Sequence, residues 1–189
     1  MANELELKAV VDDPAALRRR LVAAGATPGF RGTMQDRRYD RGGALLGRDE
    51  VLRVRALRAD DGAIEWHLGW KGPIRRSPEG YKLREEHECT VTGDRSPAAV
   101  LTALGYSEVH AIDRTVEVHA LAGATVRIET YPRMDTLIEV EGDAAGIECA
   151  ITATGLPRDA FSADSLADFV DRYERRTGVR ALIAGPTPT

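Results

Sequence analysis

The chain opens with a short charged stretch, Glu4-Leu5-Glu6-Leu7-Lys8, that reads as a β-strand. Successive side chains of a strand point to opposite faces, so Glu4, Glu6 and Lys8 share one face and the two leucines share the other. Antiparallel strands usually present the apolar face to a core and the charged face to water. Taken alone, this stretch is therefore compatible with an ordinary half-exposed strand.

The same alternation of charged and apolar residues recurs further along the chain. Three later stretches carry charged side chains at a spacing of two: Leu52-Arg53-Val54-Arg55, Arg84-Glu85-Glu86-His87-Glu88 and Ile138-Glu139-Val140-Glu141. Burying so many charges in a dry core would cost several kcal/mol each. The charged faces must therefore meet in a wet space rather than in a core.

Strands and helices alternate along the whole sequence. We expect strands at 2–11, 33–39, 50–58, 63–71, 80–92, 108–121, 124–131 and 136–142, and helices at 14–24, 94–104, 144–154 and 163–176. Asp13 and Pro14 supply the start signals of the first helix, and Gly25 supplies its stop. We expect one domain over residues 1–183 and a disordered tail over 184–189.

This pattern predicts an α+β fold, a closed eight-stranded antiparallel β-barrel with flanking helices. Closure lets the apolar faces turn outward beneath helices while the charged faces line a solvated tunnel. The expected lining contains seven acids and seven bases: Glu4, Glu6, Glu86, Glu88, Glu129, Glu139 and Glu141, with Lys8, Arg53, Arg55, Lys71, Arg84, Arg114 and Arg127.

The chemistry of this lining favours a metal–polyphosphate ligand. Clustered carboxylates are hard oxygen donors that suit Mg²⁺ or Mn²⁺. Arginines present planar forks that match phosphate oxygens. The seven acids are therefore the candidate metal ligands, and the seven bases are the candidate phosphate-binding residues.

Composition limits the other possibilities. The 189 residues are 30% charged and 43% hydrophobic with a formal net charge of −4, so no general affinity for nucleic acid or a membrane surface is expected. Cys89 and Cys149 have no metal-type spacing and are expected to be reduced thiols of a cytoplasmic protein. A monomer or a homodimer fits these properties.

The charged stretches, taken in order, resemble the CYTH family, the triphosphate tunnel metalloenzymes. Glu4-x-Glu6-x-Lys8 is similar to the N-terminal signature of that family, and Trp70-Lys71-Gly72-Pro73 is similar to its lysine-glycine-proline strand end. The other similar segments are Arg53 with Arg55, Arg84-x-Glu86-x-Glu88, Arg114, and Glu139-x-Glu141. The family often has lysine just before the arginine and aspartate before the closing pair, where this chain has Asp113 and Glu129.

The resemblance implies a metal-dependent enzyme that acts on a small triphosphate. Hydrolysis of tripolyphosphate, thiamine triphosphate or a nucleoside triphosphate is the first expectation. The alternatives are a class IV adenylate cyclase and a non-catalytic polyphosphate- or nucleotide-binding module. The expected catalytic residues are Glu4, Glu6, Lys8, Arg53, Arg55, Lys71, Glu86 and Arg114.

Several other residues have simpler interpretations. His67 shares the face of Lys71, but a lone histidine is more often structural than a ligand. Arg75 and Arg76 are expected in an exposed, mobile loop. Phe169 and Tyr173 lie one turn apart and are expected to pack a helix. Purine recognition would need a partly apolar slot, and the inward candidates for one are Val10, Leu57, His67 and Leu137. The loops expected at 40–49 and 73–79 are further candidates.

Overall fold

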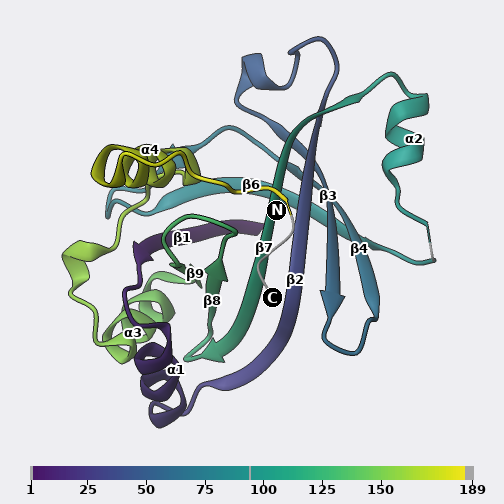
Figure 1. Cartoon of the computed structure of the whole chain (residues 1–189). Helices are drawn as coiled ribbons and strands as arrows, with labels where there is room; N and C mark the ends of the chain where they lie inside the picture. Colours follow the sequence, from purple (N-terminus) through teal and green to yellow (C-terminus); the bar gives the residue numbers. More distant parts are fainter. Residues whose placement is uncertain (1, 94, 186–189) are drawn as a thin grey trace.

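The computed structural model describes residues 2–93 and 95–185, with side chains from Leu5 onward (Figure 1). Eight antiparallel strands form a closed barrel, as predicted, because β1 pairs with both β9 and β6. Around the barrel the strands are β1 (Ala2–Val10), β9 (Leu137–Gly142), β8 (Ala124–Thr130), β7 (Ser107–Leu121), β2 (Thr27–Asp40), β3 (Val51–Ala59), β4 (Ile64–Lys71) and β6 (Lys82–Val91).

Two strands are longer than the sequence pattern indicated. β2 has 14 residues and begins at Thr27 rather than at 33, and β7 has 15 residues and begins one residue before the predicted 108. β6, by contrast, has 10 residues and is shorter than the predicted 80–92. β2 pairs with β7 along almost its whole length, with register shifts at Pro28/Arg31 and Arg38/Tyr39. The first of these irregularities accommodates Pro28 and Gly29, which by themselves suggest a turn.

The outer face of the barrel carries the main apolar core. Helix α3 (Ala144–Thr154) packs beside β9, β8 and β1, and helix α1 (Pro14–Ala23) packs against α3 (Figure 1). Each helix begins at an aspartate whose carboxylate accepts a backbone N–H. Contacts between the helices and the strands bury the outward strand side chains Leu7, Ala9, Val126 and Val140 together with Leu21 of α1 and Ile147 of α3. The alternation seen in the first strand is therefore inverted relative to an ordinary sheet, with leucines outside and charges inside.

Helix α4 (Leu166–Thr177) covers part of the inner face. β6 pairs only with residues 2–6 of β1, and Ser162 pairs with Lys8 beyond that point, which directs the chain into α4. Phe169 of α4 packs against Ile112, Tyr131 and Leu137, so the prediction that it packs a helix is confirmed. This apolar cluster closes the barrel interior at the end of the charged inner faces of the strands.

The remaining elements are short. They are β5 (Arg75–Arg76), α2 (Ala98–Ala103) and two 3₁₀ turns, Leu46–Arg48 and Arg158–Ala160. The predicted helix at 94–104 begins only at Ala98, after Pro97, and the predicted loop at 73–79 contains β5, which pairs with β6. Most of the predicted tail lies outside the described residues, although the Gly185 N–H donates to Asp113. None of the described helices has the length and apolar character that crossing a membrane requires.

Candidate functional site

The pairing register puts the predicted lining residues on the inner face. Lys8 lies opposite Glu139, Glu139 opposite Arg127, and Lys71 opposite Glu86. The other described members are Glu6, Arg53, Arg55, Arg84, Glu88, Arg114, Glu129 and Glu141, and each contacts an oppositely charged side chain. The side chain of Glu4 lies outside the described residues.

One part of the interior is a row of carboxylates on β1 and β9. The ammonium of Lys8 binds the carboxylates of both Glu6 and Glu139, with 2.6 Å between Lys8 Nζ and Glu6 Oε1. Arg127 Nη1 lies 2.5 Å from Glu139 Oε1 and 2.6 Å from Glu141 Oε2. Lys82 on β6 also binds Glu6. Three acids and three bases therefore form one continuous, mutually neutralised network, which we call the carboxylate row.

The neighbouring bases keep two acids of the carboxylate row, Glu6 and Glu139, ionised. Burial alone would raise the pKa of Glu6, but attraction to Lys8 and Lys82 outweighs it and lowers the value to about 2. Burial likewise opposes ionisation of Glu139, yet Lys8 and Arg127 hold its pKa well below the usual range. The pKa values of Lys8 and Arg127 move upward, since attraction to these carboxylates exceeds the effect of burial.

A second part of the interior is an arginine cluster around Asp36 of β2. Asp36 is only 3% exposed. Its Oδ1 accepts a hydrogen bond of 2.9 Å from Arg55 Nε, and its Oδ2 accepts one of 2.8 Å from Arg114 Nη1. Arg53 Nε lies 3.7 Å from the same Oδ1. Although burial would raise the pKa of Asp36, these guanidiniums hold it well below the usual range.

Glu129 links the arginine cluster to the covered end of the interior. Its carboxylate accepts from Arg114 Nε at 2.8 Å and from the Tyr131 hydroxyl at 2.6 Å. Burial and the charge of Glu129 raise the pKa of Tyr131 well above its usual range, so the hydroxyl stays a donor. Glu129 is one of the predicted metal ligands, but its described partners are an arginine and a tyrosine.

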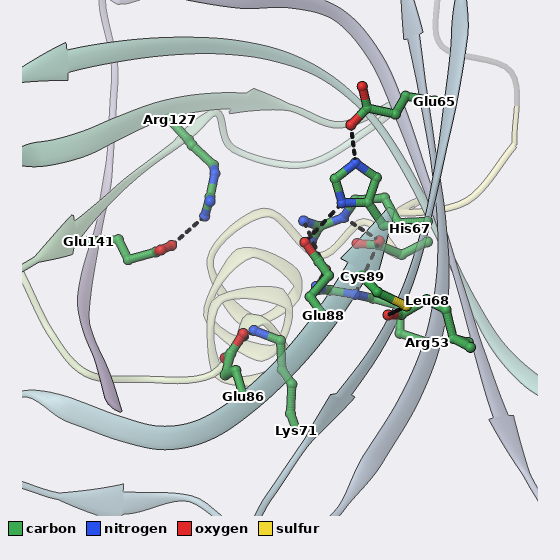
Figure 2. Close-up of polar contacts among 12 residues, drawn as sticks. Arg53, Glu65, His67, Leu68, Lys71, Glu86, Glu88, Cys89, Arg127 and Glu141 are labelled. Atoms are coloured by element: carbon green, nitrogen blue, oxygen red, sulfur yellow. Dashed lines mark hydrogen bonds and ion pairs between the residues drawn. The ribbon is translucent and has the colours of Figure 1, made fainter. Parts of the chain in front are cut away.

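The third part of the interior lies on β4 and β6 (Figure 2). Lys71 binds Glu86, and Arg53 Nη2 donates to Glu88 at 2.8 Å. Glu88 also lies 2.9 Å from His67 Nδ1, and the other ring nitrogen faces Glu65 at 2.5 Å. His67 is thus held between two carboxylates and orients Glu88 toward Arg53. Figure 2 shows Arg127 and Glu141 lying across the interior from the Lys71–Glu86 pair.

Arg84 has a different environment from the other predicted bases. Its Nε donates to the Gly72 carbonyl and its Nη2 to the Asp49 carbonyl, both at 2.6 Å. These bonds anchor the chain at the end of β4, where Gly72 passes close to Trp70. Arg84 therefore lies on the predicted face, but at least two of its N–H donors are bonded to backbone carbonyls.

The donor chemistry of the carboxylate row fits a hard divalent cation. Glu6, Glu139 and Glu141 supply carboxylate oxygens from neighbouring strands, with Glu6 directly opposite Glu141. In the part of the chain that the structure describes, no three His, Cys, Asp or Glu side chains converge as a ready cluster. Lys8 and Lys82 both bind Oε1 of Glu6, and Arg127 binds Oε2 of Glu141, so an ion at these oxygens would compete with the bases.

Several residues of the interior are not among the predicted lining residues. They are Asp36 and Arg38 on β2, Glu65 on β4 as a partner of His67, and Lys82 on β6. The run Asp36-Arg37-Arg38 places charges on both faces and hides the period of two. The available signal was the spacing of two from Asp36 to Arg38.

Two of the candidate purine contacts are covered. Leu137 is 0% exposed beneath Phe169, and Val10 packs against the same cluster. His67 is engaged by Glu65 and Glu88. Of the four candidates for contact with a purine base, only Leu57 is neither covered nor engaged by other side chains among the described residues.

The exposed residues behave mostly as expected. Arg75 and Arg76 are exposed, and Arg76 lies 3.6 Å from Asp164, a distance at which an exposed pair contributes little. Both cysteines are free and exposed. None of these residues belongs to the interior.

Comparisons with known proteins identify the fold. No protein-family model and no curated protein matches the sequence. Among solved structures, the PH1819 protein from Pyrococcus horikoshii is 23% identical with a TM-score of 0.68, covering 89% of this chain and 98% of that one. A putative adenylate cyclase from Vibrio parahaemolyticus is 14% identical with a TM-score of 0.70, covering 89% and 97%.

A third solved structure is that of HpAC1 from Hippeastrum, a putative adenylyl cyclase with a dominant triphosphatase activity. It is 16% identical with a TM-score of 0.60, covering 96% of this chain and 98% of that one. At these identities the likeness concerns the fold alone. The protein therefore has the fold of the CYTH-like proteins, the eight-stranded barrel that its charged stretches predicted.

Proposed function

We propose that the protein hydrolyses a small triphosphate in a reaction that depends on a divalent metal ion. The observation that supports this most is the barrel interior, where Lys8, Arg53, Arg55, Arg114 and Arg127 are all at least half-buried and face one space. Such a density of cations suits a linear polyanion. These charged side chains are not needed for apolar packing, since the main apolar core lies on the outer face of the barrel.

The bases would bind and neutralise the phosphate chain. Arg53, Arg55 and Arg114 present guanidinium groups held in place by Asp36, Glu88 and Glu129. Preorganised cations of this kind stabilise the charge that moves to the leaving phosphate when a phosphoanhydride bond breaks. Lys71 and Lys8 would add point charges along the chain.

Glu6, Glu139 and Glu141 would hold the metal ion, which when bound orients phosphate oxygens and lowers the pKa of water. When the substrate arrives, its phosphates offer new partners to Lys8, Lys82 and Arg127. The bases would then turn from the carboxylates toward the phosphates, which frees carboxylate oxygens for the cation. Substrate and metal binding would therefore support each other.

Hydrolysis is favoured over cyclisation by the shortage of apolar inner surface. Cyclisation of ATP would require a slot for adenine, yet Leu137 and Val10 are covered by α4. A polyphosphate end needs no such slot. The dominant triphosphatase activity of HpAC1, which shares the fold, agrees with this choice.

An adenylate cyclase is the second candidate, because the Vibrio parahaemolyticus protein with the same fold is a putative adenylate cyclase. The same bases and carboxylates would then bind ATP, with attack by the 3′-hydroxyl and release of pyrophosphate. Leu57 and the loop at 40–49 would have to supply the adenine contacts.

Product analysis separates these candidates. The protein is incubated with Mg²⁺ or Mn²⁺ and equal concentrations of tripolyphosphate, thiamine triphosphate or ATP. We expect release of inorganic phosphate, greatest with tripolyphosphate, and loss of that activity on exhaustive chelation. Cyclic AMP as the main product would establish the cyclase, and binding without turnover of any substrate would establish the non-catalytic module.

A further inference from the structure

Two arginines lie side by side on the inner face of β2 and β3. In the pairing register, Arg38 of β2 is directly opposite Arg53 of β3. On the other side, Arg38 is opposite His110 of β7. Neither cross-strand neighbour is negatively charged, and like charges at directly opposed positions destabilise a sheet.

The nearest carboxylate does not resolve this repulsion. Asp36 lies two residues from Arg38 on the same face, but both of its oxygens accept hydrogen bonds from Arg55 and Arg114. Burial lowers the pKa of Arg38; Asp36 opposes that shift, and repulsion from Arg53 and its neighbours adds to it. Within residues 5–93 and 95–185, Arg38 makes neither a hydrogen bond nor an ion pair with another side chain.

Arg53 also has donor capacity to spare. Its side chain is only 10% exposed, and its Nη2 donates to Glu88. Its Nε, however, is buried without a hydrogen-bond partner among the described residues. A buried donor left unpaired carries a desolvation cost, so such groups in native proteins usually have a ligand or water as partner.

We infer that Arg38 is a further substrate-binding residue, which together with Arg53 binds one phosphoryl group of the polyphosphate. A phosphoryl group accepts several charge-assisted hydrogen bonds and matches the guanidinium fork. It would offset the Arg38–Arg53 repulsion and occupy the free Nε of Arg53. This inference rests on the proposed function and extends the phosphate-binding set by a residue of β2.

The test compares Arg38→Gln with a matched control on the same strand. Arg37→Gln removes the same charge from the opposite face, where Arg37 Nη1 donates to Asp113 at 2.7 Å. Binding of tripolyphosphate is measured by titration calorimetry, and thermal stability is measured without ligand. We expect about tenfold to a hundredfold weaker binding for Arg38→Gln and less than about threefold change for Arg37→Gln.

Stability gives a second readout that a structural arginine would not produce. Since Arg53 lies directly opposite Arg38 and both oxygens of Asp36 are bonded to other arginines, Arg38→Gln should leave the melting temperature of the free protein unchanged or raise it. Lower stability with unchanged tripolyphosphate affinity would overturn the inference and make Arg38 structural. Arg38→Lys, which keeps the charge without the fork, should recover part of the affinity.

Measurements on the wild-type protein distinguish a failure of the triphosphatase proposal from a failure of the role proposed for Arg38. Binding without hydrolysis would refute the triphosphatase while leaving the role of Arg38 testable by affinity. Hydrolysis with undiminished binding by Arg38→Gln would refute the role of Arg38 alone. A wild-type protein that does not bind tripolyphosphate would overturn both.

Discussion

The carboxylate row and the arginine cluster neutralise charge in different ways. In the carboxylate row, Glu6, Glu139 and Glu141 share Lys8, Lys82 and Arg127, so most members have two partners. In the arginine cluster, one deeply buried carboxylate, Asp36, holds Arg55 and Arg114 and lies near Arg53.

This difference predicts how each region responds to change. Losing one member of a shared network leaves alternative partners, whereas losing a central counterion leaves several charges unpaired. The carboxylate row should therefore tolerate exchange of its partners, as metal and phosphate binding would demand. The arginine cluster should be rigid and should fail when its centre is removed.

The largest expected effect is that of Asp36→Asn. This change removes the charge beside Arg53, Arg55 and Arg114 at nearly constant volume, and breaking a buried ion pair costs about 3–5 kcal/mol. We expect a loss of free energy of unfolding in that range, measured by urea denaturation. Tripolyphosphate should restore part of it, because the ligand supplies the missing negative charge.

Glu139→Gln in the carboxylate row should destabilise the protein less than Asp36→Asn. Lys8 keeps Glu6 and Arg127 keeps Glu141, so the stability cost should be smaller than that of Asp36→Asn, about 1–3 kcal/mol. Metal-dependent turnover should nevertheless fall strongly, since a candidate ligand charge is lost. A greater loss of stability for Glu139→Gln than for Asp36→Asn would show that the distinction between shared and central counterions is wrong.

Acid should destabilise the protein through the carboxylates of both regions. The pKa of Glu6 is lowered to about 2 in the folded protein from the ordinary glutamate value of 4.5, so between these values the Glu6 side chain binds fewer protons in the folded than in the unfolded state. Its contribution is complete above about pH 5 and is lost as the pH falls toward 2. Urea midpoints measured from pH 6 to pH 2.5 should decrease, and less steeply for Glu6→Gln; parallel curves would contradict the role of Glu6.

The smallest expected effects are those of single arginine substitutions on tripolyphosphate affinity, which should differ between the interior and the surface. Arg55→Ala should weaken tripolyphosphate binding by about tenfold to a hundredfold, since a charge-assisted hydrogen bond contributes about 1.5–3 kcal/mol. Arg76→Ala should change binding by less than about threefold, because Arg76 is exposed and its distance from Asp164 is 3.6 Å. Tripolyphosphate binding by both variants is measured by titration calorimetry. If Arg76→Ala weakened binding more than Arg55→Ala, the inner face would be wrongly assigned.

The sequence itself determined which face of most strands is charged. The period of two in Glu6 with Lys8, or in Glu139 with Glu141, is a local property of an extended chain and can be read without knowing its partners. Together with the apolar alternates, it required a closed sheet with charges inside, and the structure has one. The N-terminal aspartates of α1 and α3 were equally local signals, confirmed by their caps.

Only the tertiary structure decided which charges meet. Asp36 is 78 residues from Arg114 in the chain, and their 2.8 Å contact depends on the register of β2 against β7. The position of Arg38 opposite Arg53 depends on the register of β2 against β3. Likewise, Phe169 covers Leu137 because Ser162 pairs with Lys8 and directs α4 over the inner face. Register and docking are set by many nonlocal contacts acting together, which is why local periodicity predicts the charged face but not the partner of each charge.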